Sequence, residues 1–146
     1  MIPGMINLKP KQKIALDTNI FICALNQEDS RHKVCLKILE QVDQKGINAF
    51  VSAIVLEEFF VKIYKLNKQK EINYFLDFIT MGGSVVVIDV NRDIALTAAK
   101  IRANYYIKVP DAIHLASAIE AGAKIFVTTD KKLPRKIGKL TIKVLG

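Results

Sequence analysis

Four acidic residues stand where a chain of alternating strands and helices can bring them together. Asp17 ends the segment KIALD, Asp130 ends KIFVTTD, and Asp111 opens the apolar segment DAIHLASAIEAG. Glu57 lies inside the helical segment SAIVLEEFFVKIYKL. Clustered carboxylates repel one another unless a cation lies among them, and all-oxygen ligands select hard ions such as Mg²⁺ or Mn²⁺. Because these ions lower the pKa of bound water and stabilise a leaving oxygen, the residue types favour phosphoryl-transfer chemistry.

Each acid also has an ordinary structural interpretation. Asp17 and Asp111 can cap the helices that they precede, and Asp130 can form an Asx turn. Capping and metal binding do not exclude each other, because a capping side chain already points at a helix N-terminus near the strand ends. Asp89 lacks such companions, and we interpret it as a turn residue. His114, alone in an apolar helix, is expected to be packed or hydrogen-bonded rather than to be a ligand.

The neighbouring glutamates Glu57 and Glu58 differ on a helical wheel. At spacings of three, four and seven, Glu57 shares a face with apolar or aromatic residues: Ala53, Ile54, Phe60, Val61 and Tyr64. Glu58 aligns with Lys62 and Lys65, a solvated stripe that includes a favourable i,i+4 pair. A carboxylate on a core-facing stripe is costly to bury unless it is paired, hydrogen-bonded or bound to a cation. The spacing therefore favours Glu57, with the alternative that it reaches water from the edge of the buried face.

Short apolar strands that alternate with helices must position these acids. We expect strands at residues 13–17, 48–52, 84–90, 124–130 and 140–145, the last at an edge. We expect helices at residues 18–26, 30–44, 53–66, 68–80, 92–106 and 111–122, with Ser30 as the N-cap of the second and Gly46 after its end. This pattern indicates an α/β fold, a mostly parallel sheet of about five strands with helices on both faces. In such sheets ligands bind at the carboxyl ends of the strands, where Asp17 and Asp130 lie.

The composition indicates one soluble domain over residues 1–146. Of the 146 residues, 51% are hydrophobic, which is enough for one sizeable core. No apolar run approaches the roughly 18 to 20 residues of a membrane span, and the start, MIPGMINLKPKQK, lacks the apolar stretch of a secretory signal. We therefore expect a cytoplasmic protein without a membrane partner. The formal charge of +8 and the pI of about 9.5 suit a polyanion such as nucleic acid.

Four segments resemble the PIN domain family, most closely the VapC-type toxins of bacterial and archaeal toxin–antitoxin pairs. They are ALDTNIFI, VSAIVLEEF, VPDAIHLASAIEAGA and FVTTDKKL, and they occur in the family's order over nearly the whole chain. The resemblance implies a PIN-like three-layer sandwich and a metal-dependent ribonuclease. Its acidic quartet maps onto Asp17, Glu57, Asp111 and Asp130. Asp17 and Asp111 are implied as the principal Mg²⁺ or Mn²⁺ ligands, and Glu57 and Asp130 as the residues that complete the site.

The resemblance also implies supporting residues, a mechanism and partners. Asn19 and Thr128 match polar positions that orient the acids. One or two metal ions would activate a water for in-line attack on an RNA phosphodiester, without a covalent enzyme intermediate. Members of the family are commonly homodimers, and an antitoxin tail occupies the acidic groove of the toxins. The aromatic-rich stretch 59–78 offers contacts for such partners, or it is plain core.

A basic segment follows Asp130. Residues 131–146 contain no acid, and their cations are Lys131, Lys132, Arg135, Lys136, Lys139 and Lys143. Lys131, Lys132, Arg135 and Lys136 are candidates for contacts with the phosphates of bound RNA. An ordinary solvated surface is an equally good interpretation of this segment.

Other functions remain open at this point. A non-catalytic PIN-like module for RNA binding or assembly would bind metal without cleaving RNA. An aspartyl-phosphate phosphatase of the haloacid dehalogenase type would require an acid two positions after Asp17, where this chain has Asn19. A receiver-like domain phosphorylated at Asp89 would require an acidic pair at the first strand, which is missing.

Overall fold

The computed structural model describes residues 6–44 and 46–146; the first five residues, part of the segment examined for a secretory signal, lie outside it. The strands are β1 (Lys13–Leu16), β2 (Asn48–Ser52), β3 (Val85–Ile88), β4 (Ile125–Thr128), β5 (Lys136–Ile137) and β6 (Leu140–Val144). The helices are α1 (Thr18–Leu25), α2 (His32–Gln44), α3 (Ala53–Leu66), α4 (Gln69–Leu76), α5 (Arg92–Asn104) and α6 (Val109–Glu120), and a π-helical segment, η1 (Asp77–Met81), continues α4. None of the described helices is long and apolar enough to cross a membrane.

The six strands form one sheet in the order β3-β2-β1-β4-β6-β5. Every pair is parallel except β5 with β6. From β1 the next strands in sequence run toward one edge, whereas β4 and the strands after it run toward the other edge. The strand order thus reverses between β1 and β4, and the carboxyl ends of strands at such a reversal form a crevice that binds ligands. This topology places the ends of β1 and β4, with Asp17 and Thr128, side by side.

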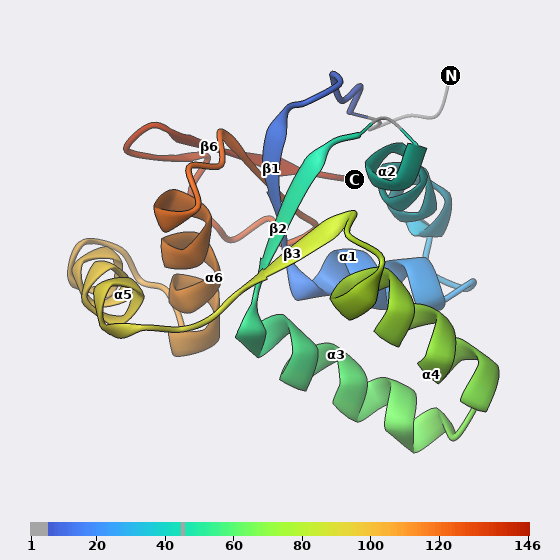
Figure 1. Ribbon diagram of the computed structural model, residues 1–146. Coiled ribbons are helices and arrows are strands. Elements are labelled where there is room, and N and C mark those ends of the chain that lie inside the picture. Colours follow the sequence, from blue (N-terminus) through green and yellow to red (C-terminus); the bar gives the residue numbers. More distant parts are fainter. Residues whose placement is uncertain (1–5, 45) are drawn as a thin grey trace.

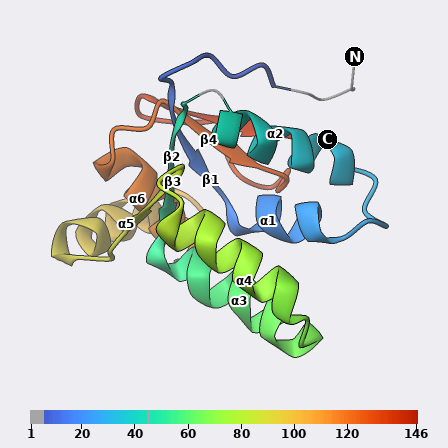
Figure 2. The ribbon, with the colours of Figure 1, turned by 45° about the vertical axis from the view of Figure 1, so that its right-hand side comes forward.

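Helices cover both faces of the sheet, as Figure 1 shows, so the expected α/β three-layer sandwich is confirmed. The side chains of β1 alternate between the two layers. Ile14 and Leu16 pack in a core with apolar residues of α1 to α4, whereas Ala15 packs in a second core with α5 and α6. Turning the molecule shows α3 and α4 as a pair beside the sheet (Figure 2). The crevice therefore has helices from both layers around it.

Several expected boundaries differ from the structure. The short strand β5 was not expected, since only two residues of it pair with β6. The helix expected at 68–80 is split into α4 and η1. The helix α2 begins at His32 rather than directly after Ser30, and in the turn before it Asp29 accepts the backbone N–H of Arg31, at 2.8 Å.

The first turn of α6 also differs from expectation. The helix begins at Val109 rather than at Asp111, with Pro110 in its first turn, where a missing N–H costs nothing. Asp111 therefore lies within the first turn and is not the cap.

Candidate active site

Asp17 is the buried centre of the site, with only 4% of its surface exposed. It caps α1, as one interpretation of the sequence expected, and its Oδ1 accepts the backbone N–H of Thr18 at 2.8 Å. Its Oδ2 accepts the hydroxyl of Thr128 at 2.7 Å and the amide of Asn19 at 3.2 Å. Burial raises the pKa of Asp17, and the nearby His114 and the hydrogen bonds from Thr128 and Thr18 oppose the rise only in part. The carboxyl group is thus held in place by hydrogen bonds, but its neighbours offset only part of the cost of burying its charge.

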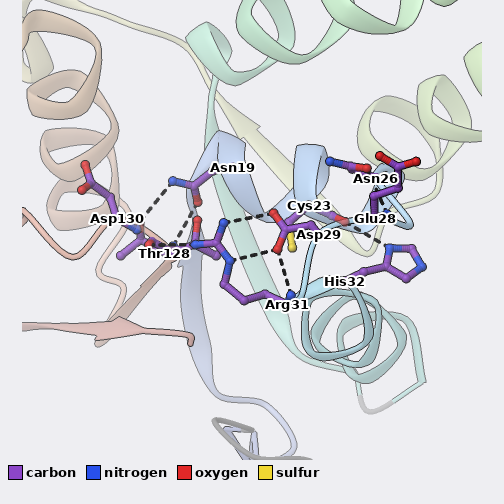
Figure 3. Close-up of polar contacts among 10 residues, drawn as sticks. Asn19, Cys23, Asn26, Glu28, Asp29, Arg31, His32, Thr128 and Asp130 are labelled. Carbon is purple, nitrogen blue, oxygen red and sulfur yellow. Dashed lines mark hydrogen bonds and ion pairs between the residues drawn. The ribbon is translucent and has the colours of Figure 1, made fainter.

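The end of β4 is tied to this centre by hydrogen bonds, and Figure 3 shows the part of the network around Asn19, Thr128 and Asp130. Asn19 accepts the backbone N–H of Thr129 at 3.1 Å, and the hydroxyl of Thr128 accepts the backbone N–H of Asp130 at 3.0 Å. Asp130 also forms the expected turn, since its Oδ1 accepts the N–H of Lys132 at 2.9 Å. Asn19 and Thr128 therefore link the Asp17 carboxylate to the end of β4.

A second set of hydrogen bonds connects the loop after α1 to the same end of β4. Arg31 donates Nε and Nη2 to the two carboxylate oxygens of Asp29, each at 3.0 Å. Its Nη1 donates to the carbonyl oxygen of Thr129 at 3.3 Å. The guanidinium group lowers the pKa of Asp29 to about 2. Figure 3 shows Arg31 between Asp29 and the β4 end, so this ion pair braces the segment that carries Asp130.

Asp111 faces the same crevice from α6. It is partly buried, and burial is the main cause of its raised pKa. The charge of Asp17 is the next cause, and the charge of Asp130 adds a smaller effect. Two aspartates from distant parts of the sequence thus act electrostatically on Asp111.

The two glutamates occupy the opposite environments from those that the helical wheel indicated. Glu57 is exposed, so the expectation of a core-facing stripe is wrong. Two residues that defined this stripe, Val61 and Tyr64, are themselves 42% and 56% exposed. Glu58 is instead partly buried and hydrogen-bonded, so the expected solvated stripe is also wrong.

Glu58 is linked to the centre of the site by two donors. Its Oε1 accepts the hydroxyl of Thr18 at 2.7 Å and lies 2.6 Å from Nε2 of His114. The hydrogen bond with His114 is the main reason for the lowered pKa of Glu58. His114 is buried and hydrogen-bonded, as expected. No local pattern in the sequence indicates this contact, because residues 58 and 114 meet only through the packing of α3 against α6.

One cavity of about 360 Å³ joins most of these groups. Its lining residues are Asp17, Thr18, Asn19, Ile22, Glu57, Glu58, Val61, Lys62 and Asp111. The structure thus brings three of the four acids of the sequence-based set, and Glu58, around one space. Asp130 does not line the cavity and stands beside it at the end of β4.

The oxygen ligands of the cavity favour a hard cation, although they do not form a complete metal site. Among residues 6–44 and 46–146, no group of three or more His, Cys, Asp or Glu side chains is close enough together to hold a metal ion. The cavity does offer carboxylate oxygens, the ligands preferred by Mg²⁺ and Mn²⁺, and both cysteines are buried elsewhere. A cation beside Asp17 and Asp111 would relieve the repulsion and the burial penalty that raise their pKa values.

Two further cavities contain residues that the sequence singled out. A cavity of about 510 Å³ is lined by Lys131, Arg135, Thr141, Ile142, Lys143, Val144 and Gly146, whereas Lys132 and Lys136 do not line it. An apolar groove of about 480 Å³ between α3 and α4 is lined by Leu56, Glu57, Phe60, Val61, Tyr64, Leu76 and Thr80. Glu57 and Val61 line both this groove and the acidic cavity.

Comparisons with known proteins agree with this fold. A family model described as the PIN domain matches residues 14–139. VapBC2 from Rickettsia felis, solved with a DNA fragment from its promoter, has a TM-score of 0.69 and 22% identity over 92% of this chain and all of that chain. A toxin–antitoxin complex from Klebsiella pneumoniae has a TM-score of 0.63 and 25% identity over 88% of this chain and 95% of that one.

A third similar structure is that of a toxin described as cleaving the sarcin–ricin loop, VapC20 of Mycobacterium tuberculosis. Its TM-score is 0.62, with 18% identity over 77% of this chain and 86% of that one. Among curated proteins, no sequence matches this chain significantly.

Proposed function

Because the chain belongs to the PIN domain family, we propose that it is a Mg²⁺- or Mn²⁺-dependent endoribonuclease of the VapC type, the toxin of a cytoplasmic toxin–antitoxin pair. The observation that carries the proposal is the pairing of Asp17 with Asp111 at the point where the strand order reverses. Both carboxyl groups have raised pKa values, and both line one cavity. Perturbed acids that converge in a cleft are typical of functional sites.

The residues in and around the cavity would have different roles in the reaction. Asp17 and Asp111 would be the principal metal ligands, and Glu58, held by Thr18 and His114, takes the place that the sequence had given to Glu57. Glu57 would contribute its carboxylate from the exposed rim of the cavity, and Asp130 would contribute its own from the end of β4. A bound metal would lower the pKa of a water and stabilise the leaving oxygen of the phosphodiester. Thr128 and Asn19 would hold the Asp17 carboxylate in its orientation.

The RNA strand would pass over the cations beyond Asp130. Lys131, Arg135 and Lys143 line one cavity, so they can neutralise neighbouring phosphates together. The guanidinium of Arg135 is fixed by bonds to the carbonyl oxygens of Leu133 and Lys131, at 2.6 and 3.3 Å. Lys132 and Lys136, also candidates from the sequence, are exposed outside this cavity and would contribute only through their charge.

The protein partners would use other surfaces. The structures from R. felis and K. pneumoniae contain toxin–antitoxin assemblies, and an antitoxin is accordingly proposed here. The apolar groove between α3 and α4 suits a segment of such an antitoxin, because it opens directly beside the acidic cavity. A homodimer is proposed from the family resemblance alone.

Cleavage of a panel of labelled RNAs tests the proposal. The pure protein should cut at least one RNA in Mg²⁺ or Mn²⁺ and none in EDTA. Asp17→Asn and Asp111→Asn should each abolish cutting while leaving the circular dichroism spectrum unchanged. Metal binding by the wild type without cleavage of any RNA would instead support the non-catalytic RNA-binding module.

A further inference from the structure

His114 has a hydrogen-bond partner at each ring nitrogen, although it lies in an apolar helix. Its Nδ1 lies 2.7 Å from the hydroxyl of Ser52, and its Nε2 lies 2.6 Å from Oε1 of Glu58. The residue is only 3% exposed. Because a carboxylate can only accept, Nε2 must be the donor to Glu58, and the Ser52 hydroxyl can donate to Nδ1. The three side chains form a directed chain from the end of β2 to the acidic cavity.

The Ser52 hydroxyl bonds to His114 instead of capping its own helix, which indicates that this chain of side chains is favoured over the local capping bond. Ser52 occupies the N-cap position of α3, where serine normally accepts a backbone N–H of the first turn. It makes no such capping bond, and its hydroxyl points to His114 instead. Helix capping is worth roughly 1 kcal/mol. Another interaction has therefore replaced a favourable one at this position.

Glu58 receives both of its donors at one oxygen. Thr18 and His114 converge on Oε1, at 2.7 and 2.6 Å. Glu58 also lines the acidic cavity with Asp17 and Asp111. A carboxylate fixed at one oxygen keeps its other oxygen in a defined direction, which is how outer residues orient the ligands of a metal.

We propose that His114 is a positioning residue that, backed by Ser52, fixes the carboxylate of Glu58 as a ligand group of the acidic cavity. The inference rests on the proposed function. It also explains why the two glutamates differ: Glu58 reaches the imidazole, whereas Glu57 lies on the exposed side of α3. His114 shares the first half of α6 with Asp111, so one helix supplies both an acid and the group that orients another acid.

The test compares Mn²⁺ affinity by calorimetry, without RNA, in four variants. His114→Leu removes the donor to Glu58, Ser52→Ala removes its support, and His114→Gln keeps a side-chain N–H in reach of Glu58. His32→Leu is the matched control, because His32 bonds to the backbone carbonyl of Cys23 at 3.1 Å and does not line the acidic cavity.

We expect His114→Leu to weaken Mn²⁺ binding about 10-fold or more, Ser52→Ala to weaken it less, and His114→Gln to restore part of the loss. His32→Leu should bind as the wild type does. The melting temperature is measured in parallel, since a purely structural histidine would lower it without changing the affinity of the folded protein. If His114→Leu does not fold, Ser52→Ala decides the matter.

Two failures are distinguishable. Wild-type Mn²⁺ affinity in folded His114→Leu or, failing that variant, in Ser52→Ala overturns the role of His114 alone. No Mn²⁺ binding by the wild-type protein, with no cleavage of RNA, overturns the proposed function and this inference together.

Discussion

The floor and the rim of the acidic cavity are built differently. On the floor, Asp17 and Thr18 are at most 5% exposed, as is His114, the hydrogen-bond partner of Thr18, and all three are bonded to one another or to neighbouring strands. Every buried side-chain nitrogen and oxygen atom among the described residues has a hydrogen-bond partner. On the rim, Glu57 and Lys62 are exposed. The floor is therefore fixed before any ligand arrives, whereas the rim can adapt to one.

The strongest test of this difference compares two single variants, in each of which one of the two adjacent glutamates is replaced by glutamine. Glu58→Gln should lower the rate of RNA cleavage at least about 100-fold, because it removes a carboxylate that Thr18 and His114 hold in place. Glu57→Gln, which loses the same charge one residue away, should change the rate far less. The rates are compared at saturating Mg²⁺. The reverse order would assign the catalytic role to Glu57, as the sequence alone indicated.

A second test loosens the floor without removing a charge. Thr128→Val takes the 2.7 Å donor from Asp17, whose buried oxygen then lacks part of its solvation. We expect a loss of about 1–3 kcal/mol in the free energy of unfolding and about 10-fold in cleavage. Thr129→Val is the control, since Thr129 is bonded through its backbone. Equal effects of the two substitutions would show that Thr128 acts only by packing.

A third test addresses the cations beyond the rim. The triple variant Lys131→Ala, Arg135→Ala and Lys143→Ala should weaken RNA binding in EDTA and reduce the slope of log K against log salt by up to about 2. The control is an equal loss of charge around the connection between α3 and α4, with Lys65, Lys68 and Lys70 changed to Ala. Similar salt slopes for the two triple variants would mean that the charge acts without a defined path for the strand.

The smallest expected effect concerns the brace between Asp29 and Arg31. The pKa of Asp29 is lowered from 3.8 to about 2 in the folded protein, mainly by the hydrogen bond from Arg31. A lowered folded-state pKa stabilises the fold above about pH 3.8, and this contribution is lost as the pH falls through about 2. Because the pair is partly exposed, its worth is at most about 1 kcal/mol.

Urea unfolding of wild type and Asp29→Asn measures this contribution. The difference in stability between the two proteins should be present near neutral pH and disappear in strong acid. Glu28→Gln, at the exposed neighbouring position, serves as the control for a simple change of charge. A difference that persists unchanged in acid would show that Asp29 acts through its turn rather than through the ion pair.

Much of the fold was predictable because its signals are local. The β-branched run that forms β3 and the apolar run that forms β1 identify buried strands without reference to the rest of the chain. Asn91 caps α5, with its side chain accepting the N–H of Ile94 at 2.9 Å, and the helix begins at residue 92 as expected. The strand β5 was not predictable, since two residues are too few to show the alternation of apolar and polar residues that identifies a strand.

The sequence by itself determined that acids follow strands of a parallel sheet, because apolar strands and amphipathic helices are encoded by neighbouring residues. Only the tertiary structure decided which glutamate of α3 faces those acids. Apolar residues occur on more than one side of that helix, and helical spacing alone does not show which side will be covered. The contact of Glu58 with His114 depends on how α3 packs against α6, and that packing is set by the whole sheet between the two layers.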